Sequence, residues 1–388
     1  MQKGKRQSNY ELLRIIAMWM VVTLHYLNHT GMLPDGEEQL NGSRIVALLL
    51  EAFCIVAVNL YVLISGYFLC RSGFRLLRLV ELLCQIWFYV LLIPLAMTIL
   101  GIETGWLAEG VYGLLPYVFP IQSEHYWFAT SYVVLYLLTP ILNAAVRSLS
   151  RRQLQLTIAG LLLYFGGIKS LIPLQLVTDS FGYDFGWFIC VYLVGAYIRG
   201  EQMEGNEQKE GNRQKRMEKC RKKGFWLFIY TASCLLIFGW VLAALWVYRK
   251  TGSMAYLMAL PFHYNFLPCL TGAIALFLAF SRIRLPEGRL SGFLCSISPL
   301  TFGVYLFHEH ILIRSQWTEY LERYTGKVTE LSVFGFLLHW FCSVLLIYGM
   351  GSLTDALRRK IFCFVGKYTE KTRLAKGLKK LERGFCDI

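Results

Sequence analysis

Residues 255–280, AYLMALPFHYNFLPCLTGAIALFLAF, run for 26 positions without a single Lys, Arg, Asp or Glu. The hydrocarbon core of a bilayer is about 30 Å thick, and roughly 20 apolar residues in a helix cross it. Lipid offers no hydrogen-bond partner to the backbone, so only helices and closed barrels span a membrane, and a continuous apolar run indicates a helix rather than a barrel strand. This stretch therefore predicts a transmembrane helix.

The rest of the chain has the same character. Of its 388 residues, 56% are hydrophobic and 16% are charged, with a mean hydropathy of +0.46. A soluble domain keeps roughly a quarter of its residues charged, so a soluble globular protein is excluded. We predict an all-α polytopic membrane helix bundle of about ten transmembrane helices. The predicted spans are residues 10–29, 45–69, 76–100, 127–146, 154–173, 184–199, 225–248, 255–280, 296–315 and 332–356.

The placement of the basic residues predicts the orientation. The chain has 39 Lys and Arg against 25 Asp and Glu, a formal net charge of +14. Most of these cations fall in every second loop, which the positive-inside rule assigns to the cytoplasm, so both termini are predicted inside. We expect a transmembrane domain over residues 1–356, with a basic loop at 201–223, and a basic cytoplasmic tail at 357–388. These basic segments suit anionic lipid, and no nucleic-acid binding is expected.

The cysteines give no sign of a disulfide or a metal. All eleven fall in predicted spans or cytoplasmic segments, where disulfides are not expected. The sequence has no CxxC motif and no Cys/His pair at the spacing of zinc ligands. We therefore expect no metal and no permanently bound cofactor.

Two ionisable residues share one face of the first span. An ionisable side chain inside a membrane costs on the order of 2.5–3.5 kcal/mol, which makes each one a functional candidate. Arg14 and His25 lie within about 20° of the same helix face and roughly 16 Å apart along the axis. Met18 and Val21 belong to the same stripe. The alternative explanation of Arg14 is an arginine that snorkels to the inner interface.

The predicted ninth span brings further ionisable residues to the depth of His25. It contains His308, Glu309 and His310 in succession. We expect His308 and Glu309 near mid-depth, at a level that His25 could meet, and two of the three to point into the bundle.

The other histidines have simpler explanations. His263 and His339 lie in the eighth and tenth spans and are expected to be hydrogen-bonded core residues. His125 begins the fourth span beside Tyr126 and Trp127, as in an interfacial aromatic belt. His29, one turn beyond His25, is expected to be exposed at the outer interface.

The end of the second span carries a third signal. Ser65-Gly66-Tyr67 allows another helix or a ligand to approach the backbone closely. Arg75 and Arg78 follow at a spacing that shares a helix face, and two adjacent guanidinium groups suit a phosphate. The alternative is that these arginines only follow the positive-inside rule.

Together these stretches resemble the acyltransferase 3 family, integral membrane enzymes that O-acylate cell-surface glycans and related acceptors. Leu13–His25 is similar to the family's opening signature, and Ser65–Tyr67 followed by Arg75–Arg78 is similar to its second-helix motif and RxxR pair. His125–Pro140 and Thr301–His308 are similar to its fourth-helix and ninth-helix patterns. The order is the same over nearly the whole ten-span region. A departure is Glu309, where the family often has proline.

The resemblance implies that His25 is the catalytic histidine and that Arg14, Arg75 and Arg78 serve acyl-donor binding or gating. We expect the arginines to hold the phosphates of acyl-CoA, with acetyl-CoA as the co-substrate. His25 is then a general base or a transient acyl acceptor. The remaining candidates, for acceptor binding or for support of His25, are His308, Glu309, Tyr305 and Trp127.

The predicted function follows from these expectations. It is an O-acyltransferase of the bacterial plasma or inner membrane that moves an acyl group, most simply acetyl, from cytoplasmic acyl-CoA to a hydroxyl of a cell-surface or lipid-linked glycan. The alternative is a transporter or flippase of a lipid-linked glycan, because buried histidines and a glutamate also suit proton coupling. Transporters usually show paired half-repeats, and residues 1–200 and 201–388 show no convincing repeat.

Overall fold

The computed structural model describes residues 6–102, 110–123, 125–172, 179–207, 215–369 and 377. Residues 208–214 of the predicted basic loop and most of the tail after 369 lie outside the described residues. Every regular element in the described ranges is helical. The α-helices are α1 (Ser8–His29), α2 (Gly42–Cys54), α3 (Ala57–Leu69), α4 (Leu76–Ile99), α5 (Gly110–Val118), α6 (Trp127–Ser148), α7 (Arg151–Leu162), α8 (Ile168–Leu171), α9 (Phe185–Glu207), α10 (Lys215–Thr251), α11 (Tyr256–Ala259), α12 (Leu267–Ser281), α13 (Arg289–Ile297), α14 (Thr301–His308), α15 (Gln316–Thr325) and α16 (Val333–Thr369).

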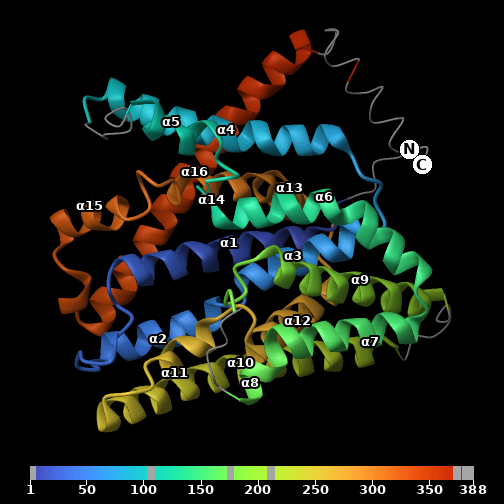
Figure 1. The fold of residues 1–388 in the computed structure, drawn as a ribbon, viewed down its shortest axis with the longest axis horizontal. Coiled ribbons are helices and arrows are strands. Elements are labelled where there is room, and N and C mark those ends of the chain that lie inside the picture. Colours follow the sequence, from blue (N-terminus) through green and yellow to red (C-terminus); the bar gives the residue numbers. More distant parts are fainter. Residues whose placement is uncertain are drawn as a thin grey trace.

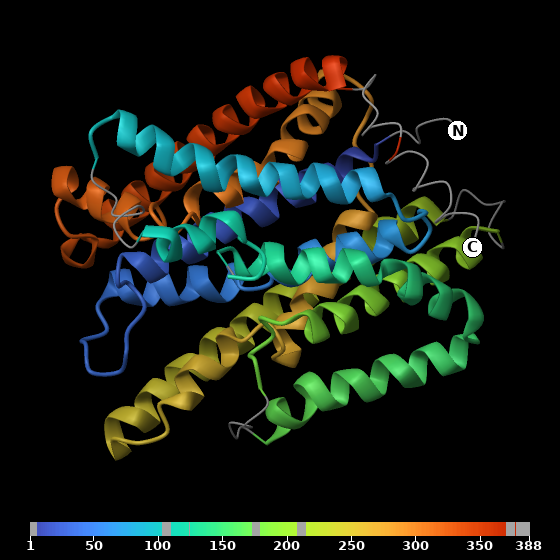
Figure 2. The same ribbon diagram turned by 45° about the horizontal axis from the view of Figure 1, so that its top comes forward.

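The predicted all-α membrane bundle is confirmed. Nine helical segments in the described ranges are long and apolar enough to cross a bilayer. Helix α9, the predicted sixth span, is not one of the nine. It packs against α3 and α6. Helix α1 begins and α16 ends toward the same side of the molecule, in agreement with both termini inside (Figures 1 and 2).

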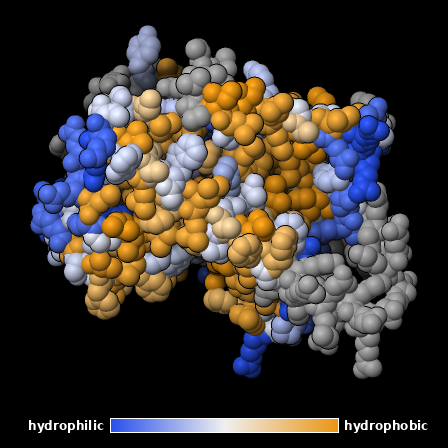
Figure 3. Space-filling view, turned by 90° about the horizontal axis from the view of Figure 1, so that it is seen from below, coloured by the Kyte–Doolittle hydropathy of each residue, from blue (hydrophilic) through white to orange (hydrophobic). Residues whose placement is uncertain are grey.

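The surface has the pattern of a membrane protein. On the face shown in Figure 3, hydrophobic side chains cover the middle of the molecule, and hydrophilic ones gather at its two ends. Helix α1 lies in the interior, where it contacts α2, α3, α12, α13, α14 and α16. Its Leu13, Ala17 and Val22 are fully buried. The stripe from Arg14 to His25 is therefore enclosed by other helices and does not face lipid.

The Ser65–Tyr67 motif lies where α9 packs closely against α3. A Cβ atom at Gly66 would overlap the Tyr192 carbonyl of α9, and one at Gly195 would overlap the Leu63 carbonyl of α3. Glycine at both positions lets the two backbones touch. This contact holds α9 in the bundle.

The ninth span differs from its prediction. It runs over Arg289–His308 rather than 296–315, and it consists of α13, a short 3-10 turn at Ser298–Leu300, and α14. Pro299 in that turn breaks the regular helix. Helix α14 ends at His308. Residues 309–315 form turns, in which the His310 carbonyl accepts hydrogen bonds from the backbone N–H groups of Ile313 and Arg314. His308 and Glu309 therefore lie at a helix end instead of near the middle of a helix.

Candidate active site

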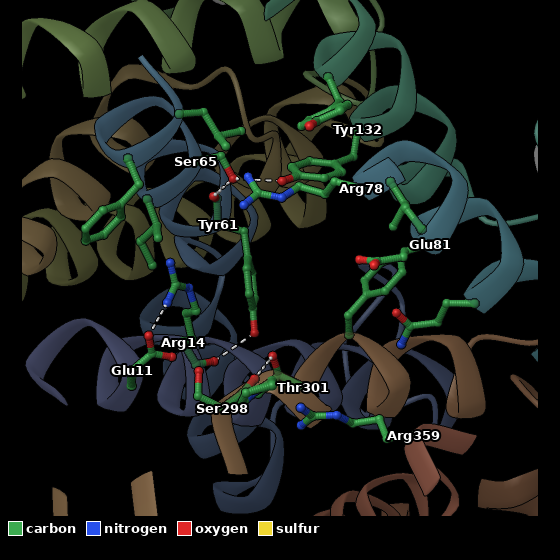
Figure 4. A pocket seen from close by; sticks show the side chains of 18 of the residues that line it. Glu11, Arg14, Tyr61, Ser65, Arg78, Glu81, Tyr132, Ser298, Thr301 and Arg359 are labelled. Carbon is green, nitrogen blue, oxygen red and sulfur yellow. Dashed lines mark hydrogen bonds and ion pairs between the residues drawn. The ribbon is translucent and has the colours of Figure 1, made fainter. Parts of the chain in front are cut away.

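A large cavity opens between α1, α3, α4, α6 and α16. Its volume is about 1330 Å³. Arg14, Arg78 and Arg359 reach into it from different helices (Figure 4). The full lining comprises Arg6, Gln7, Glu11, Arg14, Tyr61, Ile64, Ser65, Phe68, Leu69, Leu77, Arg78, Glu81, Leu82, Gln85, Phe128, Tyr132, Tyr136, Ser298, Pro299, Thr301, Phe302, Arg358, Arg359, Phe362, Cys363 and Gly366.

A second, much smaller cavity lies farther along α1. Its volume is about 40 Å³, and its lining is Met18, Val21, Leu24, His25, Val58, Tyr61, Trp127, Phe128, Tyr264, Phe302 and Tyr305. Tyr61, Phe128 and Phe302 line both cavities. The predicted stripe on α1 thus begins with Arg14 in the large cavity and ends with His25 in the small one. The two cavities adjoin at these three aromatic side chains.

His25 and His308 meet across the bundle. His25 Nδ1 lies 2.8 Å from His308 Nε2, and the ring centroids are 5.0 Å apart. His308 is fully buried, whereas the His25 side chain keeps 19% of its exposure. Contact of the first and ninth spans at this level agrees with the depth expected from the sequence.

The hydrogen bonds assign the tautomers of both rings. His308 Nδ1 lies 2.6 Å from the Val304 carbonyl oxygen, which can only accept, so Nδ1 carries a proton and donates it. A neutral His308 then has a bare Nε2, to which His25 Nδ1 donates. In a neutral His25, Nε2 is then left without a proton. The ring that lines the small cavity therefore has a free basic nitrogen.

Glu309 adds a negative charge beside this pair. Its Oε1 lies 3.2 Å from His25 Nδ1 and 3.9 Å from His29 Nε2, and its side chain is 11% exposed. A carboxylate at this distance favours a positive charge on the imidazole of His25. A carboxylate beside a histidine that faces the reacting group is the arrangement of a catalytic triad, in which the carboxylate stabilises the imidazolium that forms.

The same cluster is the one place in the described ranges where three side chains are arranged as metal ligands. One ligand atom each of His25, His308 and Glu309 lies within 4.8 Å of the others. Two histidines and a carboxylate suit a transition-metal ion. However, His25 Nδ1 and His308 Nε2 already share a hydrogen bond, and a metal ion would have to replace it.

The three predicted donor-site arginines lie in different surroundings. Arg14 lines the large cavity, where Nη1 donates to Glu11 Oε1 at 2.8 Å. Arg78 also lines the cavity. Arg75 does not line it. Its backbone N–H and C=O instead hold the Tyr136 hydroxyl, at 3.2 and 3.1 Å, at the start of α4.

Tyr305 and Trp127 both line the small cavity, as does His25. Tyr305 is buried, and its hydroxyl has no hydrogen-bond partner among the described residues. Trp127 stacks on Tyr264, with ring centroids 5.7 Å apart and planes 19° from parallel. These aromatic side chains close the cavity around His25.

The remaining histidines form hydrogen bonds or packed pairs. His339 bonds to the Tyr26 hydroxyl at 2.7 Å, and His263 bonds to Lys169 Nζ at 3.0 Å. His125 is 4% exposed and packs against His310 with ring centroids 4.6 Å apart. His125 therefore belongs to the interior rather than to an interfacial belt.

Several residues near the cavities have no place in the predicted site. His29 belongs to the Glu309 cluster, and its position one turn after His25 was a usable signal. Glu51 is a buried carboxyl whose Oε2 lacks a partner in the described part of the chain, and an acidic residue inside an apolar run is itself a signal. Arg358 and Arg359 line the large cavity although they fall in the predicted tail.

Comparison with protein families assigns the chain. The model of the acyltransferase domain that defines the acyltransferase 3 family matches residues 7–353. No curated protein and no solved structure gives a match. The matched region contains both cavities except for Arg6 and the part of α16 after residue 353. The chain belongs to the acyltransferase 3 family and is a multi-pass membrane acyltransferase.

Proposed function

We propose that this enzyme transfers an acetyl group from cytoplasmic acetyl-CoA to a hydroxyl of a cell-surface or lipid-linked glycan in the plasma or inner membrane of a bacterium. One observation carries the proposal. A large cavity lined by arginines adjoins a small cavity lined by His25, and both lie along one face of α1. A donor that enters from the inside can thus place its reactive end beside a histidine near the outer end of that helix.

The large cavity suits the charged end of the donor. It exceeds the roughly 300–1,000 Å³ typical of pockets for drug-sized ligands. Its lining has five arginines against two glutamates: Arg6, Arg14, Arg78, Arg358 and Arg359 against Glu11 and Glu81. Guanidinium groups form strong paired hydrogen bonds with phosphates. The side on which the arginines gather is the predicted cytoplasmic side, where acyl-CoA is available.

The aromatic boundary suits the thin part of the donor. Tyr61, Phe128 and Phe302 line both cavities, and the Tyr61 hydroxyl donates to the Arg14 carbonyl at 2.7 Å. An uncharged pantetheine arm can pass apolar rings without loss of ionic hydration, whereas phosphates would be desolvated there. The phosphates therefore remain in the large cavity.

The small cavity favours a short acyl group. A buried site needs about 10–15 Å³ for each water, so 40 Å³ holds about three water-sized groups. An acetyl group is of that size. Longer acyl chains would have to displace Met18, Leu24 or the surrounding aromatic rings.

The tautomers support general-base catalysis by His25. Its Nε2 takes the proton of the acceptor hydroxyl while that oxygen attacks the thioester carbonyl. The C–S bond then breaks, and the imidazolium returns the proton to the leaving thiolate of CoA. Glu309 stabilises the imidazolium, and His308 fixes the ring through Nδ1. His25 is four residues from the end of α1, so the acceptor approaches from the outer side.

The test uses the purified full chain in nanodiscs with radiolabelled acetyl-CoA and lipid-linked glycans extracted from the producing cells. We expect release of CoA thiol and labelled glycan, and loss of both with His25→Ala. Retained transfer in His25→Ala would remove the histidine from the mechanism. Movement of the glycan across the bilayer without consumption of acetyl-CoA would support a transporter instead.

A further inference from the structure

One wall of the large cavity comes from outside the region that defines the family. The family match ends at residue 353, whereas α16 continues to Thr369. Past that point the helix contributes Arg358, Arg359, Phe362, Cys363 and Gly366 to the lining. This segment was expected to begin a tail on the lipid surface, yet it faces the proposed donor.

Arg358 and its partners fix this part of α16. Arg358 Nε and Nη2 donate to Asp355 at 2.7 and 3.1 Å, and its guanidinium lies 4.9 Å from the Phe362 ring centroid. Asp355 is fully buried and also accepts from Gln85 and Tyr89 of α4, at 3.0 and 3.1 Å. The charge of Arg358 is neutralised, and α16 is held against α4.

Arg359 is the next residue and has no such partner. Its side chain is exposed and reaches into the cavity that Arg78 of α4 also enters (Figure 4). Neither guanidinium makes a hydrogen bond or ion pair with any side chain that the structure describes. Arg14, by contrast, is paired with Glu11, and Arg6 donates to the Cys295 carbonyl.

We propose that Arg359 binds a phosphate at the nucleotide end of coenzyme A, in the cavity whose opposite wall carries Arg78. The inference rests on the proposed function, since it assigns a residue to that donor. A terminal phosphate carries a charge of about −1.5 to −2 and can accept paired hydrogen bonds from the guanidinium group of Arg359. The fixed neighbour Arg358 orients Arg359 without competing for the ligand. The enzyme therefore binds coenzyme A, which carries a nucleotide, more tightly than pantetheine 4′-phosphate, which lacks one.

Binding to the purified full chain in nanodiscs tests the assignment. Coenzyme A and pantetheine 4′-phosphate are titrated into wild type, Arg359→Gln and Lys360→Gln. Lys360 is the matched control, because it is an exposed cation on the same helix that does not line the cavity. A hydrogen bond to a charged group is worth about 1.5–3 kcal/mol, so Arg359→Gln should weaken coenzyme A binding by roughly 10-fold to 100-fold. Lys360→Gln should change it less than about twofold.

The outcomes separate this inference from the proposed function. If coenzyme A binds wild type and Arg359→Gln equally, the role of Arg359 is overturned but the proposed function is not. Equal weakening of both ligands in Arg359→Gln overturns the assignment to the nucleotide end. A wild type that binds neither ligand overturns the acyl-CoA proposal together with this one. Melting temperatures equal to that of wild type show that a variant is folded, and Arg359→Lys should recover part of the affinity.

Discussion

His308 Nε2 lies 2.8 Å from His25 Nδ1, although the two histidines are 283 residues apart in the chain. The bond fixes the ring orientation of His25 and leaves its Nε2 as the free nitrogen. Replacing His308 with alanine should therefore lower transfer even though His308 itself is buried. General-base contributions are about 10²-fold to 10⁴-fold, and we expect a loss near the lower end for His308→Ala and near the upper end for His25→Ala. Turnover with acetyl-CoA measures both.

The control for this prediction is His339→Gln. His339 is another histidine of the membrane region, and glutamine can keep its hydrogen bond with the Tyr26 hydroxyl. We expect nearly normal turnover. A loss in His339→Gln as large as that in His308→Ala would show that damage to packing, and not the orientation of His25, explains the result.

Glu309→Gln should lower kcat with little change in KM for acetyl-CoA. The carboxylate is 3.2 Å from His25 Nδ1 and acts on a charge that exists only as the proton moves. A single electrostatic group of this kind contributes about 10²-fold to 10³-fold. Steady-state kinetics separate the two constants. A raised KM with normal kcat would place Glu309 in donor binding and contradict its proposed role.

Acyl-chain selectivity should follow the size of the small cavity. With a volume of about 40 Å³, wild type should use acetyl-CoA much better than butyryl-CoA. Met18→Ala removes a side chain that lines only this cavity, and it should raise kcat/KM for butyryl-CoA relative to acetyl-CoA by about 10-fold or more. An unchanged ratio would show that the acyl group does not occupy this space.

Metal ions should inhibit the enzyme, and chelation should not. The proposed proton transfer uses His25 and its hydrogen bond to His308, so treatment with EDTA is expected to leave transfer intact. Added Zn²⁺ can be ligated by His25, His308 and Glu309 and would then replace that bond. Turnover measured across a Zn²⁺ titration checks this. Loss of activity with EDTA that returns with Zn²⁺ would instead indicate a catalytic metal.

An ion pair near the outer face should contribute strongly to stability. Lys169 pairs with Asp179, and the two side chains are 2% and 4% exposed. Removing one partner of a buried pair costs about 3–5 kcal/mol, so Asp179→Asn should lower Tm markedly in a thermal scan. Lys169→Met combined with Asp179→Asn should recover part of the loss. A single variant as stable as wild type would contradict this role.

The same pair predicts a pH effect. Burial tends to raise the pKa of Asp179, but hydrogen bonds from Lys169, Asn265 and the Phe181 N–H together with the charge of Lys169 lower it overall. The folded state thus binds this proton more weakly than the unfolded state, whose pKa is about 3.9. The stabilisation is complete above that value and is lost as the pH falls through the folded pKa. The Tm of wild type should fall as the pH is lowered below about 4, and the Tm of Asp179→Asn should lack the part of this fall that Asp179 causes.

The membrane bundle and the face of α1 were predictable because both depend on local periodicity. A long apolar run indicates a span wherever it occurs, and eleven residues of helix place Arg14 and His25 in line. The pairing of His25 with His308 was expected only as a match of depth. Which nitrogens meet depends on the backbone of α14, where the Val304 carbonyl orients the ring.

Other features depend on contacts that sequence patterns do not encode. The ninth span begins earlier than predicted because α13, which precedes the break at Pro299, packs on α1 and forms the first part of the span. Arg359 resembles any basic residue after a span. Its place in the cavity follows from Asp355, which binds Arg358 and two side chains of α4 and so directs the end of the helix.

The three aromatic residues shared by the cavities have a consequence for the cell. A cavity of about 1330 Å³ inside a membrane protein is a potential leak for protons and other ions if it continues to the opposite face. Tyr61, Phe128 and Phe302 lie between the large cavity and the small cavity of about 40 Å³. Hydrophobic constrictions block ion flow because water withdraws from them. With the donor proposed above, this closure would let a cytoplasmic thioester come close to the outside without dissipating the electrochemical gradient of the membrane.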